Sequence, residues 1–511
     1  MEDSLTLVLN ENRVNVHKGK LASKSRYFAA LFSHNFNDSS NKEHIINYDI
    51  DLCTLQNFVE WIHDDNHVDT YCHSIKSSMT KFMKDNFVEL INLLQLSTLF
   101  VVEELTNDVV EIIVLCWLLP ERVIDIWLLS QELGIKILQD ICLSVCLDRF
   151  EELPLLSLLK LTKDNLTRLL ENVNVRSSIE HLYRVIDYCK TSQFLSVNAE
   201  KERQLKFIQG IVIYETYEDA TKVAHLYTWN GSVLSKCVQL KNMQESRKSL
   251  IGMQVASRGF NVYTIGGEWG LGTGHFNDII WRYCLLSRKW YYQAKLRYSR
   301  RHMVAAFLKN KLVIVGGVGK HRLKLFTVDI LDIHTGQWRD GARIPESFTD
   351  VPPHCVLNEK LFLIKSSVYI YHPKEDYWQA ILIHNNPVVQ RVDAFLTRAT
   401  TLFLTDRHLD ETVLSKIDVA KESICNREEC LKQQIEHIVL PNTNIVYEDD
   451  LYELRYVHVA GIGIMVLNMN SDDKYEYLHL HTEIRKDIGN CFIPKVGCLN
   501  IMDPNSLYDT V

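Results

Sequence analysis

Hydrophobic residues recur along the chain with two different periods. Up to about residue 190 they are spaced three and four positions apart, as at Leu55, Phe58 and Ile62, which places them on one face of a helix. Two further stripes lie within residues 123–130 and 138–145 and are separated at Gly134. This spacing predicts a mostly helical first part that is built from paired helices.

The rhythm changes near Phe207. Short runs rich in Val, Ile, Tyr and Phe follow, such as "FNVYTIGG" and "KLVIVGG", and turn residues separate them. Such runs are typical of strands, and their regular spacing indicates repeats. We therefore expect an all-β second part, joined to the first through the polar stretch 197–204.

Glycine pairs and tryptophans carry the repeat. Gly266–Gly267 and Gly316–Gly317 each end an apolar run. In three places an apolar or aromatic residue stands seven positions before a tryptophan: Tyr283 and Trp290, Leu331 and Trp338, and Tyr371 and Trp378. Glycine lets backbones approach closely, and a repeated tryptophan fills the space between neighbouring sheets. We predict structural roles for these residues.

The glycine-rich runs do not predict a nucleotide site. A phosphate loop needs Gly, four residues, and then Gly-Lys-Ser/Thr, but in "KLVIVGGVGKHR" Ile314 stands at the first glycine position and His321 at the hydroxyl position. In "TIGGEWGLGTGH" the third glycine of a dinucleotide motif is replaced by His275. We expect no nucleotide and no other cofactor.

Composition excludes several classes of function. The 511 residues carry a net charge of −8 with no basic face, which argues against nucleic-acid binding. The most apolar run, 109–119, contains Glu111 and ends at Pro120, too short to span a membrane. The 13 cysteines lack zinc-site spacing and fit reduced thiols, and the N-terminus carries no secretion signal. We expect a cytoplasmic protein without a bound metal.

No Ser/His/Asp set or pair of carboxylates with catalytic spacing can be identified in the chain. The sequence therefore predicts no catalytic residues and no enzyme.

The double glycine followed by tyrosine and tryptophan resembles the kelch repeat, a four-stranded blade of a β-propeller. The likeness is best over residues 248–338 and weaker up to Trp378, where Lys365–Ser366 replace the glycines. The resemblance implies a kelch propeller of about six blades over residues 205–511, some of them degenerate.

The first part resembles two other domains. "VNVHKGKLASKSRYFAALF" (14–32) is similar to the BTB (POZ) domain, and residues 141–189 resemble the BACK domain, although the usual second half of BACK is missing. The order of the three regions along the chain, BTB, BACK and kelch, resembles that of the BTB-kelch (kelch-like) family. It implies an α+β BTB/POZ domain at 1–118, a truncated helical BACK-like domain at 119–196, and the all-β propeller at 205–511.

The resemblance implies a BTB homodimer that acts as a substrate adaptor of a cullin-3 RING ubiquitin ligase. In adaptors that bind cullin-3, the loop after the Tyr-Phe helix carries a hydrophobic residue, any residue, and Glu. Here Phe36, Asn37 and Asp38 occupy these positions, with Asp in place of Glu. Two alternatives stay open: Phe36 belongs to the core and Asp38 to a turn, or the protein is an actin-associated scaffold or a competitor that does not recruit the ligase.

On a propeller blade, the loop before the innermost strand and the loop after the second strand emerge on the same face. Positive groups and one tryptophan gather in these loops: Arg247, Trp269, Arg300, Arg301 and Lys320. Such a set suits an acidic peptide as substrate. The alternative is that these charges are solvated loop residues.

Overall fold

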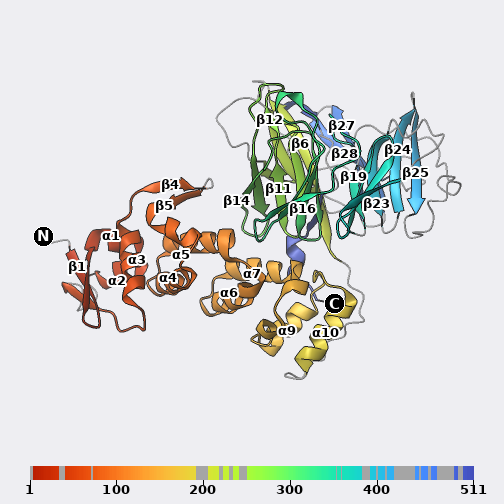
Figure 1. Ribbon diagram of the computed structural model, residues 1–511. Coiled ribbons are helices and arrows are strands. Elements are labelled where there is room, and N and C mark those ends of the chain that lie inside the picture. Colours follow the sequence, from red (N-terminus) through yellow and green to blue (C-terminus); the bar gives the residue numbers. More distant parts are fainter. Residues whose placement is uncertain are drawn as a thin grey trace. The chain divides into compact units, whose positions relative to one another are not determined.

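The computed structural model places the chain in two compact units, residues 1–201 and 202–511 (Figure 1). It describes residues 4–33, 41–70, 73–190, 205–217, 222–229, 234–240, 250–352, 354–357, 359–381, 392–398, 401–408, 411–418, 443–447, 450–458, 462–468, 488–492 and 499–510.

The first unit begins with a small sheet. Strands β1 (Ser4–Leu9) and β2 (Asn12–His17) form an antiparallel hairpin, and β3 (Glu43–Ile45) runs parallel to β1. Alternate residues of β1, namely Leu5, Leu7 and Leu9, are buried, because successive side chains of a strand point to opposite faces. The short helices α1 (Lys18–Lys24) and α2 (Arg26–Leu31) follow.

Helices surround one buried aromatic residue, Phe100, which lies just after α4. The ring centroid of Phe100 is 4.9 Å from that of Phe28 in α2 and 5.4 Å from that of Phe58 in α3. The elements that follow α2 and β3 are α3 (Leu52–His63), β4 (His67–Thr70), β5 (His73–Lys76), the 3-10 helix η2 (Ser77–Met83), α4 (Phe87–Leu99), α5 (Glu103–Ile112) and the π-helical turn η3 (Ile113–Trp117). The apolar stripe predicted for α3 is confirmed, since Leu55, Phe58 and Ile62 are buried.

A helical hairpin continues the unit. Helices α6 (Pro120–Glu132) and α7 (Lys136–Asp148) are separated at Gly134, whose φ of 68° is readily adopted by glycine. The paired helices predicted from the spacing are therefore present. The remaining helices of this region are η4 (Phe150–Glu152), α8 (Leu155–Leu158), α9 (Lys163–Leu170) and α10 (Ile179–Lys190).

The second unit is built from antiparallel sheets, as the sequence predicted for an all-β part, and in most of them the strands follow one another in chain order. Three sheets have four strands among the described residues. They are β10 (Gln254–Arg258), β11 (Asn261–Ile265), β13 (Ile279–Cys284) and β14 (Lys289–Lys295); β15 (Val304–Leu308), β16 (Lys311–Val315), β17 (Val328–Asp332) and β18 (Trp338–Gly341); and β19 (His354–Leu357), β20 (Lys360–Ile364), β21 (Val368–His372) and β22 (Tyr377–Ile381).

Two further sheets have three described strands each. They are β23 (Val392–Arg398), β24 (Thr401–His408) and β25 (Glu411–Asp418), and then β26 (Thr443–Tyr447), β27 (Asp450–His458) and β28 (Ile462–Asn468).

The last sheet joins the two ends of the unit. It contains β6 (Phe207–Tyr217), β7 (Lys222–Trp229), β8 (Leu234–Gln239) and β29 (Ile488–Phe492), and β30 (Leu499–Met502) also pairs with β6. The first strands of successive sheets are neighbours in the order β10, β15, β19, β23 and β26; β30 lies beside β10, and β26 lies beside β6. The C-terminal strands therefore pair with the strand that opens the unit.

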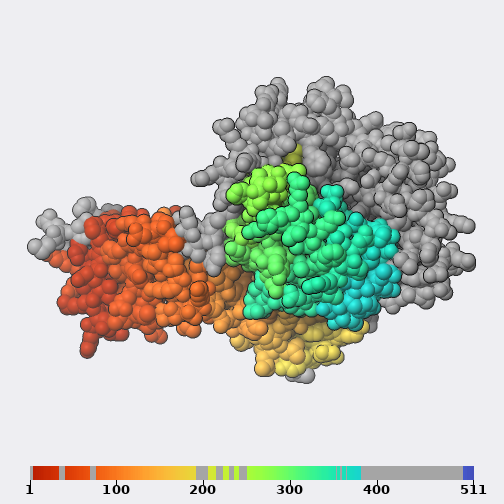
Figure 2. Space-filling view, turned by 45° about the horizontal axis from the view of Figure 1, so that its top comes forward, coloured from red at the N-terminus to blue at the C-terminus, as the bar shows by residue number. Residues whose placement is uncertain are grey.

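Hydrophobic clusters fill the spaces between successive sheets. One cluster joins Val212 and Leu226 to Val255 and Tyr283, and the next joins Ile265 to Ile314. A third joins strands β15–β17 to strands β20 and β21. Figure 2 shows most of residues 250–381, coloured green to cyan, as one continuous body of side chains. Burial between the faces of adjacent sheets therefore holds this part of the unit together.

Within the described residues, no helix is both long and apolar enough to cross a membrane. Eight cysteines are free thiols: Cys53, Cys116, Cys142, Cys146, Cys189, Cys237, Cys284 and Cys355.

Candidate functional site

A buried arginine connects the sheet of strands β10, β11, β13 and β14 to the sheet of strands β15–β18. Arg300 lies between β14 and β15 and is 1% exposed. Its guanidinium forms an ion pair with Asp329 of β17 and donates to the carbonyl of Gly316 at 3.1 Å, while its backbone carbonyl accepts from the N–H of Gly267 at 2.9 Å. Burial raises the pKa of the Asp329 carboxyl, and the charges of Arg300 and Arg297 act in the opposite direction.

A second buried ion pair lies next to the first. Nε of Arg301 is 3.1 Å from a carboxylate oxygen of Glu268, and the two side chains are 10% and 3% exposed. The other oxygen of Glu268 accepts from the N–H of Gly274 at 2.8 Å. The backbone of Arg301 exchanges two hydrogen bonds with Val318, at 3.0 and 2.8 Å. One carboxylate and its arginine thus hold two loops, residues 270–275 and the segment that follows Gly317.

The glycine pairs sit against these arginines. Gly266 and Gly317 have φ values of 63° and 90°. Residues with a side chain larger than a hydrogen atom rarely adopt these values. A Cβ on Gly266 would lie 2.7 Å from the carbonyl oxygen of Arg300, and a Cβ on Gly317 would lie 2.7 Å from that of Arg301. Both glycines therefore meet backbone from the segment that precedes β15.

The seven-residue spacing before each tryptophan corresponds to one hairpin register. Tyr283 faces Trp290, Leu331 faces Trp338 and Tyr371 faces Trp378 on neighbouring strands. Each of the three tryptophans is half-buried against the cluster between its own sheet and the preceding one. The indole N–H of Trp378 also donates to the carbonyl of Ala342, just after β18, at 2.8 Å.

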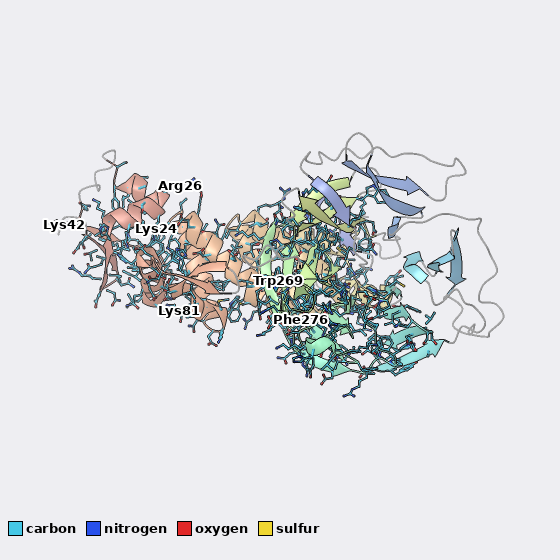
Figure 3. All side chains as sticks on the ribbon, turned by 90° about the horizontal axis from the view of Figure 1, so that it is seen from above. Lys24, Arg26, Lys42, Lys81, Trp269 and Phe276 are labelled. Carbon is cyan, nitrogen blue, oxygen red and sulfur yellow. The ribbon has the colours of Figure 1, made fainter. Side chains whose placement is uncertain are left out.

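Two exposed loops project beside the ion pairs. Residues 270–275 lie between Trp269 and Phe276, which are labelled in Figure 3, and Leu271 of this loop is 63% exposed. The second loop, 320–326, connects β16 to β17, and residues 320–324 are all exposed. The loops approach each other, because Nη2 of Arg322 lies 3.5 Å from the position that a Cβ on Gly272 would take.

The predicted propeller-loop residues differ in how far the structure exposes them to solvent. Lys320 is exposed and Trp269 is half-buried, whereas Arg300 and Arg301 lie beneath the loops in ion pairs. Contact of these residues with a substrate stays a prediction. The other predicted residues, Arg247 and Phe36, Asn37 and Asp38, lie outside the described residues.

Sequence reasoning missed that Asp329 and Glu268 pair with the two arginines, and it missed the exposed loop residues Leu271, Leu323 and Phe326. A signal existed for Glu268, which directly follows a glycine pair. No comparable signal marks which leucines of the second unit are exposed, because strands on both sides of each loop are equally apolar.

The first unit has an exposed apolar surface around Phe100, which we call the Phe100 surface. Its residues are Tyr48, Leu99 and Val101, which are 43%, 37% and 40% exposed. Tyr48 contacts the ring of Phe100 edge-on, with 6.3 Å between centroids. Val101 accepts a backbone hydrogen bond from Arg26 at the start of α2, so this surface borders the helix that leads to residues 34–40.

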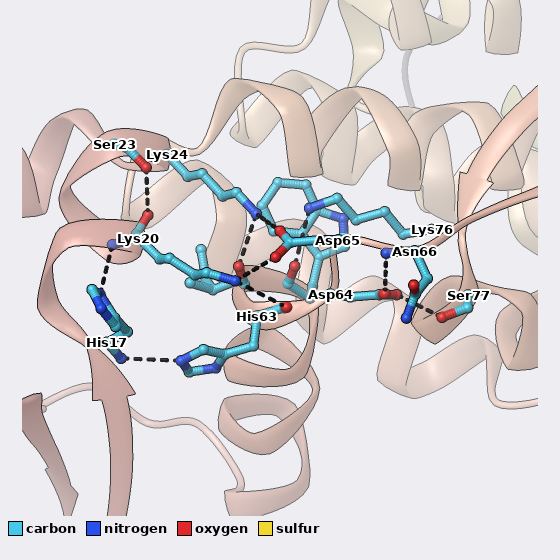
Figure 4. Close-up of polar contacts among 12 residues, drawn as sticks. His17, Lys20, Ser23, Lys24, His63, Asp64, Asp65, Asn66, Lys76 and Ser77 are labelled. Carbon is cyan, nitrogen blue, oxygen red and sulfur yellow. Dashed lines mark hydrogen bonds and ion pairs between the residues drawn. The ribbon is translucent and has the colours of Figure 1, made fainter.

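Three lysines converge on the C-terminal end of α3, as Figure 4 shows. Each ammonium donates to one of three successive carbonyls: Lys76 to Trp61 at 3.1 Å, Lys24 to Ile62 at 2.8 Å and Lys20 to His63 at 3.5 Å. The last carbonyls of a helix have no hydrogen-bond partner within it, and the lysine ammonium groups supply one. Their positive charge also interacts favourably with the negative end of the helix dipole. Burial, together with the nearby Lys24, lowers the pKa of Lys76 to about 8.

The turn after α3 is fixed by a carboxylate. Burial alone would raise the pKa of Asp64, but hydrogen bonds from the backbone N–H groups of Ser78 and Asn66 and from the hydroxyl of Ser77 lower it to about 2. These bonds attach the β4–β5 hairpin to the end of α3.

Among the described residues, no group of three or more His, Cys, Asp or Glu side chains could hold a metal ion. Residues 4–109 match the family model of the BTB/POZ domain, and residues 299–344 match that of the Kelch motif. The Kelch match includes Arg300, Gly316–Gly317, Asp329 and Trp338. The comparison with curated proteins gives no match.

Proposed function

Because this chain carries a BTB/POZ domain and a Kelch motif, as expected of a BTB-kelch protein, we propose that it recruits a protein substrate to a cullin-3 ubiquitin ligase. BTB and Kelch domains indicate a protein-interaction adaptor, and no catalytic family is indicated. BTB domains mediate dimerisation, so the adaptor would be a homodimer. We place its action in the cytoplasm.

The domain organisation that we propose is a BTB/POZ domain at 1–118, a truncated BACK-like helical domain at 119–196 and a propeller at 205–511. Support for a closed propeller of about six blades comes from the neighbour order of the first strands and from β30, which lies beside β10 and pairs with β6. Pairing of the first strand of the unit with its last strands would remove the exposed edges that an open array of sheets leaves.

The observation that carries the cullin-3 proposal is the Phe100 surface. Tyr48, Leu99 and Val101 form an exposed apolar surface on the BTB/POZ domain, and Tyr48 comes soon after Phe36, Asn37 and Asp38 in the chain. Exposed aromatic and aliphatic side chains of this kind anchor protein partners. We propose that Phe36 joins this surface as the central anchor and that Asp38 offers a carboxylate at its rim.

The test is a direct pull-down of the full-length chain with purified cullin-3. Phe36→Ala should weaken binding about thirtyfold, because truncating a buried anchor costs about 2 kcal/mol or more, and should leave the melting temperature unchanged. Asp38→Glu should hold or strengthen binding. The control Val88→Ala truncates a side chain that is 71% exposed on α4 and should change nothing. Light scattering of the same samples should give twice the chain mass of 59.4 kDa.

Absence of binding by the unmodified chain would refute the adaptor proposal. If Phe36→Ala instead unfolds the BTB/POZ domain, then Phe36 is a core residue. A second candidate, an actin-associated scaffold or a competitor that does not recruit the ligase, is favoured by the shorter carboxylate of Asp38. Co-sedimentation with actin filaments by a chain that does not bind cullin-3 would support the scaffold.

A further inference from the structure

The loops 270–275 and 320–326 expose apolar and cationic side chains together. Leu271 and Leu323 are 63% and 62% exposed, and Phe326 is 44% exposed. Lys320, Arg322 and Lys324 stand among them on the second loop. We call these six residues the loop surface.

The cations of the loop surface differ from other exposed cations of the second unit. Lys320, Arg322 and Lys324 form no ion pair within the part of the chain that the structure describes. Other exposed cations of the same unit do have partners: Arg297 lies 2.6 Å from Asp340, Lys309 lies 3.3 Å from Glu359, and Lys295 lies 3.0 Å from Asp278. A protein with a net charge of −8 thus presents a locally positive surface here.

Buried groups hold the loop surface in place before any partner binds. Glu268 connects Gly274 of the first loop to Arg301, Arg301 is bridged to Val318, and Val318 is bridged to Lys324 of the second loop. A surface that is ordered in advance loses little entropy on binding.

The backbone of the second loop is also strained. His321 and Arg322 have φ values of 55° and 58°, a left-handed conformation that residues with a side chain rarely adopt. In this conformation the Arg322 guanidinium reaches the loop of the neighbouring sheet.

We infer that the loop surface binds an acidic peptide segment that carries an apolar residue. Carboxylates would pair with Lys320, Arg322 and Lys324, and the apolar side chain would cover Leu271, Leu323 and Phe326. Nucleic acid fits less well, because a phosphate backbone needs a continuous basic groove, whereas Leu323 stands between Arg322 and Lys324 here. The inference rests on the proposed function, because it names the substrate class of the adaptor.

The experiment measures fluorescence anisotropy of a capped, labelled Glu-Glu-Leu-Glu-Glu peptide with the full-length chain. Three competitors, with Gln for every Glu, with Ala for Leu, and single-stranded oligo(U) RNA, test charge, anchor and nucleic acid. We expect the Ala peptide to bind about tenfold more weakly, as loss of a buried leucine side chain predicts. The Gln peptide should bind still more weakly, and added salt should weaken the Glu peptide alone.

Variants locate the binding. Lys320→Glu/Lys324→Glu should weaken the Glu peptide about tenfold, since each exposed charge pair contributes up to a factor of about five. The control Arg288→Glu/Lys374→Glu makes the same change in net charge in the turns between β13 and β14 and between β21 and β22, and should leave affinity unchanged. Leu271→Ser/Leu323→Ser should remove the preference for the Leu peptide over the Ala peptide.

Equal affinity of the unmodified chain and the Lys320→Glu/Lys324→Glu variant, no detectable binding of the Glu peptide, or tighter binding of oligo(U) would each overturn the inference. Cullin-3 pull-down with the same variants separates the two proposals. If cullin-3 binds but the peptide does not, only this inference fails. If the peptide binds through the loop surface and cullin-3 does not bind, the ligase proposal fails and the loop surface remains.

Discussion

Replacing Asp329 with Leu should destabilise the second unit by about 3–5 kcal/mol, because removal of one partner leaves a buried charge uncompensated. Arg300 is 1% exposed, and it would keep hydrogen bonds to two backbone carbonyls, of Gly316 at 3.1 Å and of Tyr298 at 3.3 Å, and a contact with the ring of Tyr298, whose centroid is 5.7 Å from the guanidinium carbon. Carbonyl dipoles offset only part of the cost of burying a full guanidinium charge.

Replacing the arginine of this ion pair should cost less stability than replacing the aspartate. In Arg300→Met, Asp329 keeps a second cation, because Nη1 of Arg297 lies 3.6 Å from its carboxylate and the Arg297 side chain is 32% exposed to water. We expect a loss of about 1–3 kcal/mol. The double variant Arg300→Met/Asp329→Leu should be more stable than Asp329→Leu alone, since it removes the orphaned charge and fills the site with apolar atoms.

Hydrogen exchange read by mass spectrometry at increasing urea concentrations measures these differences locally. Peptides that cover β16 and β17 report the unfolding of this part of the second unit, whereas peptides from α3 and α4 serve as an internal reference in the first unit. The order of stability should be unmodified chain, Arg300→Met, and then Asp329→Leu. Asp329→Leu proving as stable as Arg300→Met, or more so, would refute the asymmetry that the Arg297 contact predicts.

Two further substitutions test the packing and electrostatics described above. Gly317→Ala should lower the urea midpoint of β15–β17 by more than Gly336→Ala does, because both glycines have positive φ but a Cβ would meet backbone only at Gly317 and nothing within 4 Å at Gly336; equal losses would show that the backbone yields. The second test concerns Lys76, whose pKa is lowered by burial from 10.5 to about 8. Between these values the unfolded chain binds more protons than the folded chain, so the unfolding free energy of the first unit should rise with pH relative to that of Lys76→Met, by on the order of 2 kcal/mol. Urea unfolding of both chains from pH 7 to 10.5 checks this, and parallel pH profiles would contradict it.

Local patterns in the sequence predicted the classes of element correctly. The spacing of Leu55, Phe58 and Ile62 predicts one buried face of a helix, and α3 buries these residues. The apolar runs that end in glycine pairs predict strands, and β11 and β16 end directly before Gly266 and Gly316. These signals succeed because the helical and strand periods arise from backbone geometry within a few residues. The BTB and Kelch resemblances rest on motifs of similarly short range.

Whether a charged loop residue faces water or a buried partner was decided by the tertiary structure alone. Arg300 and Lys320 look alike in the sequence as cations in loops next to apolar strands, yet Arg300 is buried against Asp329 and Lys320 is exposed. The partners of Arg300 and Arg301, Asp329 and Glu268, come from other loops and strands, so no local pattern shows which carboxylate pairs with which arginine. Burial of an ionised group depends on whether packing brings an opposite charge within a few ångströms, because water is replaced only where that compensation exists.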